Sequence, residues 1–113
     1  MRVKRGLVSK RKHNKLKALT KGYRGTKSRL VKMQHEAALH AGAYAFHGRK
    51  LKKRDIRSLW IIRIGEAAKK EGLSYSEFMG KLKKDKVEID RKILSDLVLN
   101  DLETFKKIVA SVK

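Results

Sequence analysis

The sequence has no cysteine and no proline among its 113 residues, and aromatic residues make up only 6%. Without cysteine, neither a disulfide framework nor a thiolate metal site can form. No apolar run reaches the roughly 18 residues that a membrane helix needs, and the basic N-terminus leads into no hydrophobic signal region. We therefore expect a soluble, cytoplasmic chain that forms one domain, or a small domain with an extension.

Acidic residues are scarce in the first half of the chain. Residues 1–54 contain 18 Lys and Arg but a single acid, Glu36, which gives +17; residues 55–113 contain 13 Lys and Arg and 10 acids, which gives +3. Solubility of a small domain needs a net charge of only about 2–8, and a block of like charge is typical of an interaction tail. The sequence predicts a basic helical RNA-binding extension over 1–54 and a small globular all-α domain over 55–113.

Strand-like alternation is nowhere sustained, and helical spacing of apolar residues dominates. We therefore predict an all-α fold, in which a long basic helical N-terminal extension leads into a small C-terminal helical bundle. In the extension we expect a helix over residues 7–19 and then a turn at the two glycines of TKGYRGTKS, because glycine tolerates positive φ.

A second, long helix is expected to begin at a cap formed by Thr26 or Ser28 and to run as far as Glu71. Alanine-rich sequence supports it, whereas Gly42 and Gly48 weaken it, each by about 1 kcal/mol. We expect the helix to be bent or frayed near Gly48 when no partner is bound.

Helix stop and start signals divide the second half. Gly72 is a stop signal, Ser74 and Glu77 fit a capping box, Asp90 fits a cap, and Asn100 or Asp101 caps the last helix. Three short helices are predicted, with these side chains directed inward: Phe78, Met79, Leu82, Ile93, Leu94, Leu97, Val98, Leu102, Phe105, Ile108, Val109 and Val112.

The charge of the first half indicates a nucleic-acid partner. Basic residues point around most of the helix at 7–19, which suits a crevice with phosphates on several sides, as folded RNA provides. No zinc-finger spacing, heptad zipper or helix-turn-helix pattern favours sequence-specific DNA binding. A sequence-independent DNA-compacting protein is the main alternative; an anionic-membrane-binding helix is disfavoured because bulky apolar anchors are few.

Aromatic residues within the basic half allow base stacking. For Tyr23, in a glycine-flanked turn, stacking or phosphate contact is as well supported as the alternative, which is packing between helices or simple contact with a helix surface. For Phe46, packing of this kind is favoured. Tyr44 is a further candidate for stacking.

Metal and catalytic chemistry have little support. His35 and His40 bracket a zincin-like sequence, but that chemistry needs His at i and i+4, and a spacing of five turns the second ring about 140° away. No nucleophile–base set is recognisable, so we expect no enzyme, cofactor, metal or small-molecule substrate.

Five segments then resemble a known family. The most specific frame, KxxxRxLWxxRI, is carried by Lys53, Arg57, Leu59, Trp60, Arg63 and Ile64. With the other segments, in order and at these separations, the chain is similar over nearly its whole length to the bacterial-type large-subunit ribosomal protein L-twenty family. The segments are RVKRG (2–6), TKGYRGTKSR (20–29), AGAYAFHGRKLKKRDIRSLWIIRI (41–64), GLSYSEFMGKLKK (72–84) and VEIDRKILSDL (87–97).

The resemblance implies a primary rRNA-binding protein that acts early in assembly of the large subunit, beside neighbouring ribosomal proteins, in a bacterial cytoplasm or an organelle. Some members of the family also bind their own messenger RNA and repress its translation, an alternative role here. Two positions depart from the family: Ile62 stands where a small residue is usual, and Gly65 where asparagine is usual. The first should alter local packing, and the second removes a polar side chain.

The predicted RNA contacts are basic residues of the extension and of its junction with the domain, together with one tyrosine. At that junction we expect Ile56, Leu59, Trp60 and Ile64 to line the first wall of the core, with Trp60 a core residue rather than a stacking platform. The full set of predicted contacts is Arg2, Lys4, Arg5, Lys10, Arg11, Lys12, Lys15, Lys21, Tyr23, Arg24, Lys27, Arg29, Arg49, Lys50, Lys52, Lys53, Arg54, Arg57 and Arg63.

Overall fold

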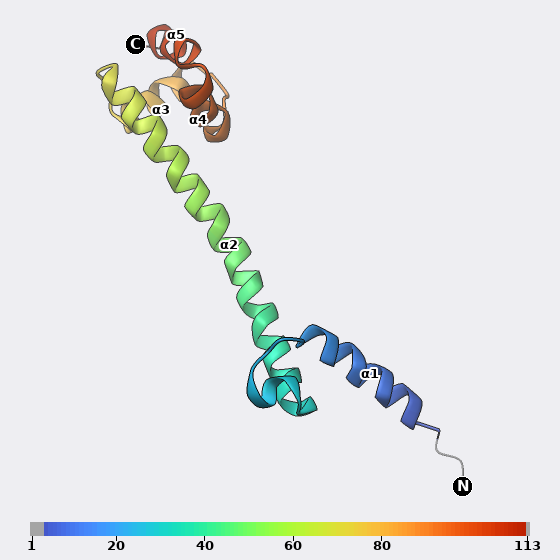
Figure 1. Ribbon diagram of the computed structural model, residues 1–113. Helices are drawn as coiled ribbons and strands as arrows, with labels where there is room; N and C mark the ends of the chain where they lie inside the picture. Colours follow the sequence, from blue (N-terminus) through green and yellow to red (C-terminus); the bar gives the residue numbers. More distant parts are fainter. Residues whose placement is uncertain (1–3, 113) are drawn as a thin grey trace. The chain divides into compact units, whose positions relative to one another are not determined.

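The computed structural model describes residues 4–112, and helices are the only regular secondary structure in that range (Figure 1). The all-α fold, with a long helix leading to smaller ones, is therefore confirmed. The chain divides into two compact units between Lys50 and Leu51, four residues before the predicted boundary. The elements in chain order are α1 (Gly6–Leu19), the 3-10 helix η1 (Gly25–Ser28), α2 (Val31–Lys70), α3 (Tyr75–Lys84), α4 (Arg91–Asn100) and α5 (Leu102–Ser111).

In the first unit, α1 has the predicted extent and buries none of its side chains. It ends at Thr20, whose buried hydroxyl donates to the carbonyl oxygen of Leu16 at 3.1 Å. The predicted glycine turn follows, with φ of +87° at Gly22 and +64° at Gly25. Side chains other than glycine rarely adopt these angles, so the two glycines allow the chain to reverse here.

The long helix starts later than expected. Thr26 and Ser28 lie in η1 and do not cap α2, which begins at Val31. The side-chain amide of Gln34 instead donates to the carbonyl oxygen of Ser28, and Gln34 is fully buried. A buried side chain reaching back to the preceding turn thus holds the entry to α2. The helix continues through Gly42 and Gly48 without interruption.

In the second unit, α2 ends as predicted at Gly72, where φ is +82°. The amide of Leu73 donates to the carbonyl of Ala68 at 3.1 Å, and the amide of Gly72 to that of Lys69 at 3.0 Å. This pair of bonds is a Schellman motif, which satisfies carbonyls left without helical partners. Leu73, the residue behind the glycine, is buried in the core.

The predicted caps of the short helices are present. The Ser74 amide donates to Glu77 Oε2 at 2.8 Å, and the Glu77 amide donates to Ser74 Oγ at 3.3 Å, which completes the capping box. Asp90 accepts from the amide of Ile93 at 2.8 Å and so caps α4. Of the two candidates for the last helix, Asp101 is the cap: it accepts from the amide of Thr104 at 3.1 Å.

The core of the second unit is built from the end of α2 and from α3 to α5. The rings of Phe78 and Phe105 meet with centroids 5.6 Å apart and planes tilted by 60°. Four of the predicted inward residues pack at the edge of this core: Met79, Leu97, Val98 and Ile108. Its buried apolar residues are Ile64, Ala67, Ala68, Leu73, Phe78, Leu82, Leu94, Phe105, Val109 and Val112.

Two residues predicted to be buried are exposed: Ile93 by 52% and Leu102 by 44%. Both lie in the first turn of their helices. The side chains that face the core are instead Leu94 in α4 and Phe105 in α5. A ten-residue helix exposes most of its circumference, so helical spacing alone does not specify which apolar row faces inward.

The prediction for the KKRDIRSLWIIRI stretch is only partly right. Ile64 is fully buried, whereas Leu59 is 43% exposed and Ile56 is only half-buried. Trp60 is half-buried and lies outside the core cluster, so placing it in the core was wrong. The short helices cover the turns of α2 before Ile64 only in part: Trp60 and Arg63 border a hollow shared with α4, whereas Leu59 and Ile62 stay exposed.

Candidate nucleic-acid interface

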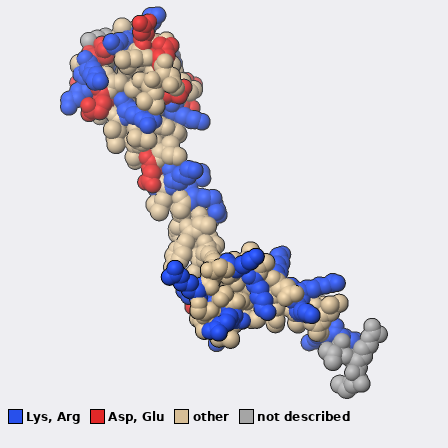
Figure 2. All heavy atoms as spheres, in the orientation of Figure 1, with Lys and Arg blue, Asp and Glu red and all other residues tan. Residues whose placement is uncertain are grey.

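Lysine and arginine side chains cover the first unit (Figure 2). In this view hardly any acidic side chain appears beside them, whereas the second unit shows both signs intermixed. Seventeen of the predicted contacts are exposed, and Arg63 alone is half-buried. Arg2 lies outside the described residues. The exposed contacts are Lys4, Arg5, Lys10, Arg11, Lys12, Lys15, Lys21, Tyr23, Arg24, Lys27, Arg29, Arg49, Lys50, Lys52, Lys53, Arg54 and Arg57.

Helix α1 presents its charges over more than half of its circumference. At 100° per residue, Lys10, Arg11, Lys12 and Lys15 are spread over about 200° of the circumference. No residue of the helix is buried and only Leu16 is half-buried, so burial against protein does not account for this arrangement. Such a helix is suited to a partner that surrounds it with negative charge.

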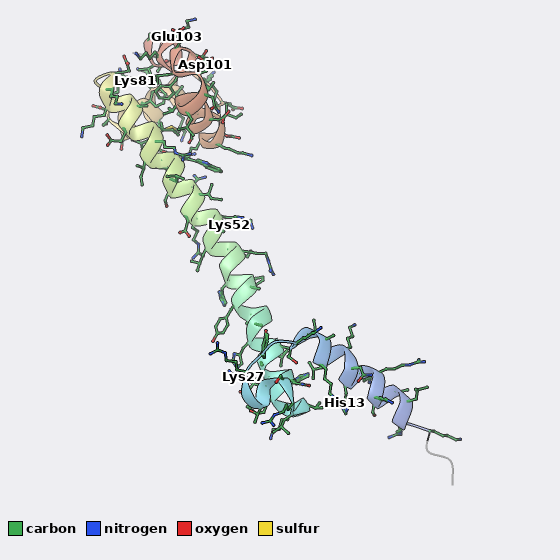
Figure 3. All side chains as sticks on the ribbon, viewed as in Figure 1. His13, Lys27, Lys52, Lys81, Asp101 and Glu103 are labelled. Atoms are coloured by element: carbon green, nitrogen blue, oxygen red, sulfur yellow. The ribbon has the colours of Figure 1, made fainter. Side chains whose placement is uncertain are left out.

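Lys27 in η1 and Lys52 in α2 are both exposed (Figure 3). Residues 1–54 contain only one carboxylate that could neutralise them, that of Glu36. Its nearest cationic candidate is His40, whose Nε2 is 3.9 Å from Glu36 Oε1. The positive charge of the extension is therefore not balanced within it, and long exposed lysine and arginine side chains are available for phosphates.

The aromatic side chains of the extension lie at its surface. Phe46 is 53% exposed; the His47 ring lies edge-on at 5.9 Å and Lys50 Nζ lies 5.4 Å from the centre of its ring. Of the two kinds of packing expected for Phe46, these contacts are those of a side chain on its own helix surface. Tyr44 is 71% exposed and stacks on His40 at 6.1 Å. Tyr23 is 37% exposed and lies at the edge of a hollow.

That hollow, which we term the tyrosine groove, lies within the first unit and has a volume of about 460 Å³. Sequence reasoning treated Glu36, His40 and Tyr44 separately and missed that they share a groove. Their spacing of four residues was the available signal, because such residues lie on one helix face. The residues that line it are Tyr23, Lys27, Met33, Glu36, Ala37, His40, Ala41 and Tyr44.

Arg63 differs from the other predicted contacts. It is half-buried and lines a second hollow, in the second unit, beside Trp60 and Asp90. Ser95, whose buried hydroxyl has no hydrogen-bond partner, lines the same hollow. An arginine with acidic neighbours is less available to phosphate than the exposed residues of the extension.

No three His, Asp or Glu residues within 4–112 gather closely enough to hold a metal ion. No helix in the described part of the chain is long and apolar enough to cross a membrane. Fold and charge together define an all-helical protein whose first half is a strongly basic surface.

The chain matches the family model of ribosomal protein L20 over residues 2–108. It is also 46% identical, over 112 residues, to the large ribosomal subunit protein bL20 of Albidiferax ferrireducens, covering 99% of this chain and 94% of that protein. The chain belongs to the ribosomal protein L20 family, as its sequence motifs predicted. Members of this family are structural constituents of the large ribosomal subunit.

Proposed function

We propose that the protein binds large-subunit rRNA directly through its basic extension and organises that RNA early in subunit assembly. The single observation that carries this proposal is the charge of residues 1–54, +17 with one acid, displayed on exposed side chains of α1, the glycine turn, η1 and the first part of α2. Phosphates between neighbouring RNA helices would neutralise these side chains and be held at a fixed separation. The extension would gain order as it binds.

The first test is a competition titration at physiological salt between structured rRNA fragments and duplex DNA of equal length. We expect RNA to win, because a thin helix charged all round fits a crevice better than the outside of a duplex. Equal affinities would instead favour the sequence-independent DNA-compacting alternative. Crosslinking to total cellular RNA, with the sites mapped, then identifies the rRNA helices and shows whether the protein's own messenger RNA is bound.

The second test compares two triple variants that each remove three exposed lysines. One replaces Lys10, Lys12 and Lys15 with glutamine; the matched control replaces Lys84, Lys92 and Lys107. Each lost phosphate contact lowers the slope of log affinity against log salt by about 0.7–0.9. We expect the slope to fall by about two units in the first variant and to change little in the control. Equal changes would show that net charge, and not the extension, governs binding.

A further inference from the structure

The tyrosine groove contains the only acidic residue of the basic half. Glu36, His40 and Tyr44 follow one another at intervals of four along α2, with Glu36 Oε1 3.9 Å from His40 Nε2 and the His40 and Tyr44 rings stacked 27° from parallel. The three side chains thus form a continuous row, from a carboxylate to an aromatic face. All three are exposed and so available to a ligand.

The groove has room because the helix surface beside this row carries small side chains. Ala37 and Ala41 lie one turn apart and line the groove, while Tyr23 and Lys27 border it from the turn and η1. Its volume of about 460 Å³ lies within the ~300–1,000 Å³ typical of ligand pockets. An aromatic row over an alanine floor is suited to a flat, partly apolar ligand.

The carboxylate of Glu36 restricts which flat ligands can bind in the groove. On a surface that binds phosphates, an acidic side chain is repelled by the backbone of the nucleic acid, so Glu36 weakens binding unless it contacts donors. Unpaired bases supply such donors on their Watson–Crick edges while their faces stack on aromatic rings. Guanine carries two adjacent donors, N1–H and N2–H, that match both oxygens of one carboxylate. Each other base offers a carboxylate only one such donor position.

We propose that the tyrosine groove receives a single unpaired guanine of the bound RNA. Tyr44, His40 and Tyr23 contact the base faces, Glu36 accepts from N1–H and N2–H, and Lys27 lies beside the adjoining phosphate. The proposal rests on the rRNA-binding function above and adds a base-specific site to an otherwise charge-driven interface.

The decisive test uses Glu36→Gln in the full-length protein and three RNA hairpins, identical except for one bulged nucleotide: guanine, inosine or none. Inosine lacks the N2 amino group and keeps N1–H. We expect wild-type protein to prefer the guanine hairpin over the inosine hairpin by about tenfold. In the variant this preference should be lost, while affinity for the hairpin without a bulge stays equal or rises because a repelling charge is gone. Uniform tightening on all three hairpins overturns the proposal.

A second pair of variants tests whether the open volume of the tyrosine groove and the aromatic face of Tyr44 are needed for guanine binding. Ala41→Leu fills the groove without removing a polar group, and leucine has nearly the helix propensity of alanine. Tyr44→Leu removes the stacking face, worth about tenfold in affinity for a stacked base. Both should lose the guanine preference, whereas Phe46→Leu, which removes an exposed ring outside the groove, should keep it. A guanine preference that survives filling of the groove would place the base elsewhere.

These measurements separate the two proposals. Wild-type protein that binds all three hairpins tightly, with no difference among them, refutes the guanine site and leaves rRNA binding intact. If wild-type protein binds duplex DNA as tightly as these RNAs, both the rRNA-binding function and the guanine site are refuted, because the guanine site requires a specifically bound RNA. Circular dichroism of each variant confirms that its helices are retained before affinities are compared.

Discussion

Neighbouring residues of α4 have opposite environments. Leu94 is fully buried in the core, whereas Ile93 is 52% exposed, although both are large aliphatic side chains in the same helical turn. Removal of a buried leucine side chain leaves a cavity as well as losing apolar contact, and typically costs about 2–5 kcal/mol. An exposed side chain loses little of either.

We therefore predict that Leu94→Ala lowers the free energy of unfolding by about 2–5 kcal/mol, whereas Ile93→Ala changes it by about 0.5 kcal/mol or less. Urea unfolding followed by far-ultraviolet circular dichroism measures both. Equal destabilisation by the two variants would contradict the inward orientation of Leu94 and the outward orientation of Ile93 in α4.

At the scale of single elements, two glycines of the second unit have different backbone angles. Gly72, at the end of α2, has φ of +82°, whereas Gly80 lies inside α3 with an ordinary helical φ. A built Cβ meets no atom within 4 Å at either position, so only the backbone distinguishes the two substitutions.

Gly72→Ala should destabilise the protein by about 1–2 kcal/mol, the cost of a left-handed conformation for a residue with a Cβ. Gly80→Ala should stabilise it by about 0.5–1 kcal/mol, because alanine restricts the unfolded chain and favours helix. Thermal unfolding measures both variants, whose melting temperatures should change in opposite directions. A gain in melting temperature for Gly72→Ala would rule out the Schellman motif at the end of α2.

The cap of α5 depends on pH. The hydroxyl of Thr104 and then its backbone amide donate to Asp101, and these bonds hold the pKa of that carboxyl below its ordinary value of 3.8. A carboxyl whose pKa is lower in the folded state stabilises the fold above the unfolded pKa, and this contribution disappears as pH falls through the folded value. The cap of α5 is therefore weakened by acid below about pH 3.8.

Asp101→Asn replaces this cap with a neutral one that also accepts from an amide. We expect the melting temperature of the wild type to fall more than that of the variant between pH 5 and pH 2. Thr104→Val, which removes the hydroxyl donor, should likewise lessen the acid sensitivity. If all three proteins show the same change in melting temperature, Asp101 does not titrate differently in the folded state.

At the scale of the whole molecule, the two units differ in what holds them together. Helix α1 buries none of its 14 residues, and isolated helices of about 12–15 residues are marginal in water. The second unit contains a core of ten buried apolar residues, among them Phe78 and Phe105. Local stability follows buried apolar contact, so it should be low in α1 and high in α5.

Hydrogen exchange of the full-length protein measures this difference. Without RNA, the amides of α1 should exchange rapidly and those of α5 slowly. On adding an rRNA fragment that binds, protection should rise in α1 and stay unchanged in α5, because only the first depends on phosphates to offset its like charges. Strong protection of α1 in the free protein would contradict the proposal that the extension gains order on binding.

The sequence by itself determined the helices, the distribution of charge and most of the helix ends; the start of α2 at Val31 is the exception. Gly72, the Ser74–Glu77 capping box and the caps Asp90 and Asp101 act on their own backbone neighbours, so local chemistry is enough to place them. The charge of residues 1–54 is likewise a property of composition, and the family motifs are a property of residue order.

Only the tertiary structure decided which apolar residues are covered. Ile93, Leu102 and Trp60 have the character and spacing of core residues, yet two are exposed and the third is half-buried outside the core. The reason is geometric: a short helix has several rows of apolar side chains, and only the row that contacts the neighbouring elements is buried. The tyrosine groove depends on tertiary structure in the same way. It joins Tyr23, in a turn, to a row on α2 more than ten residues later, and no periodicity within one helix connects them.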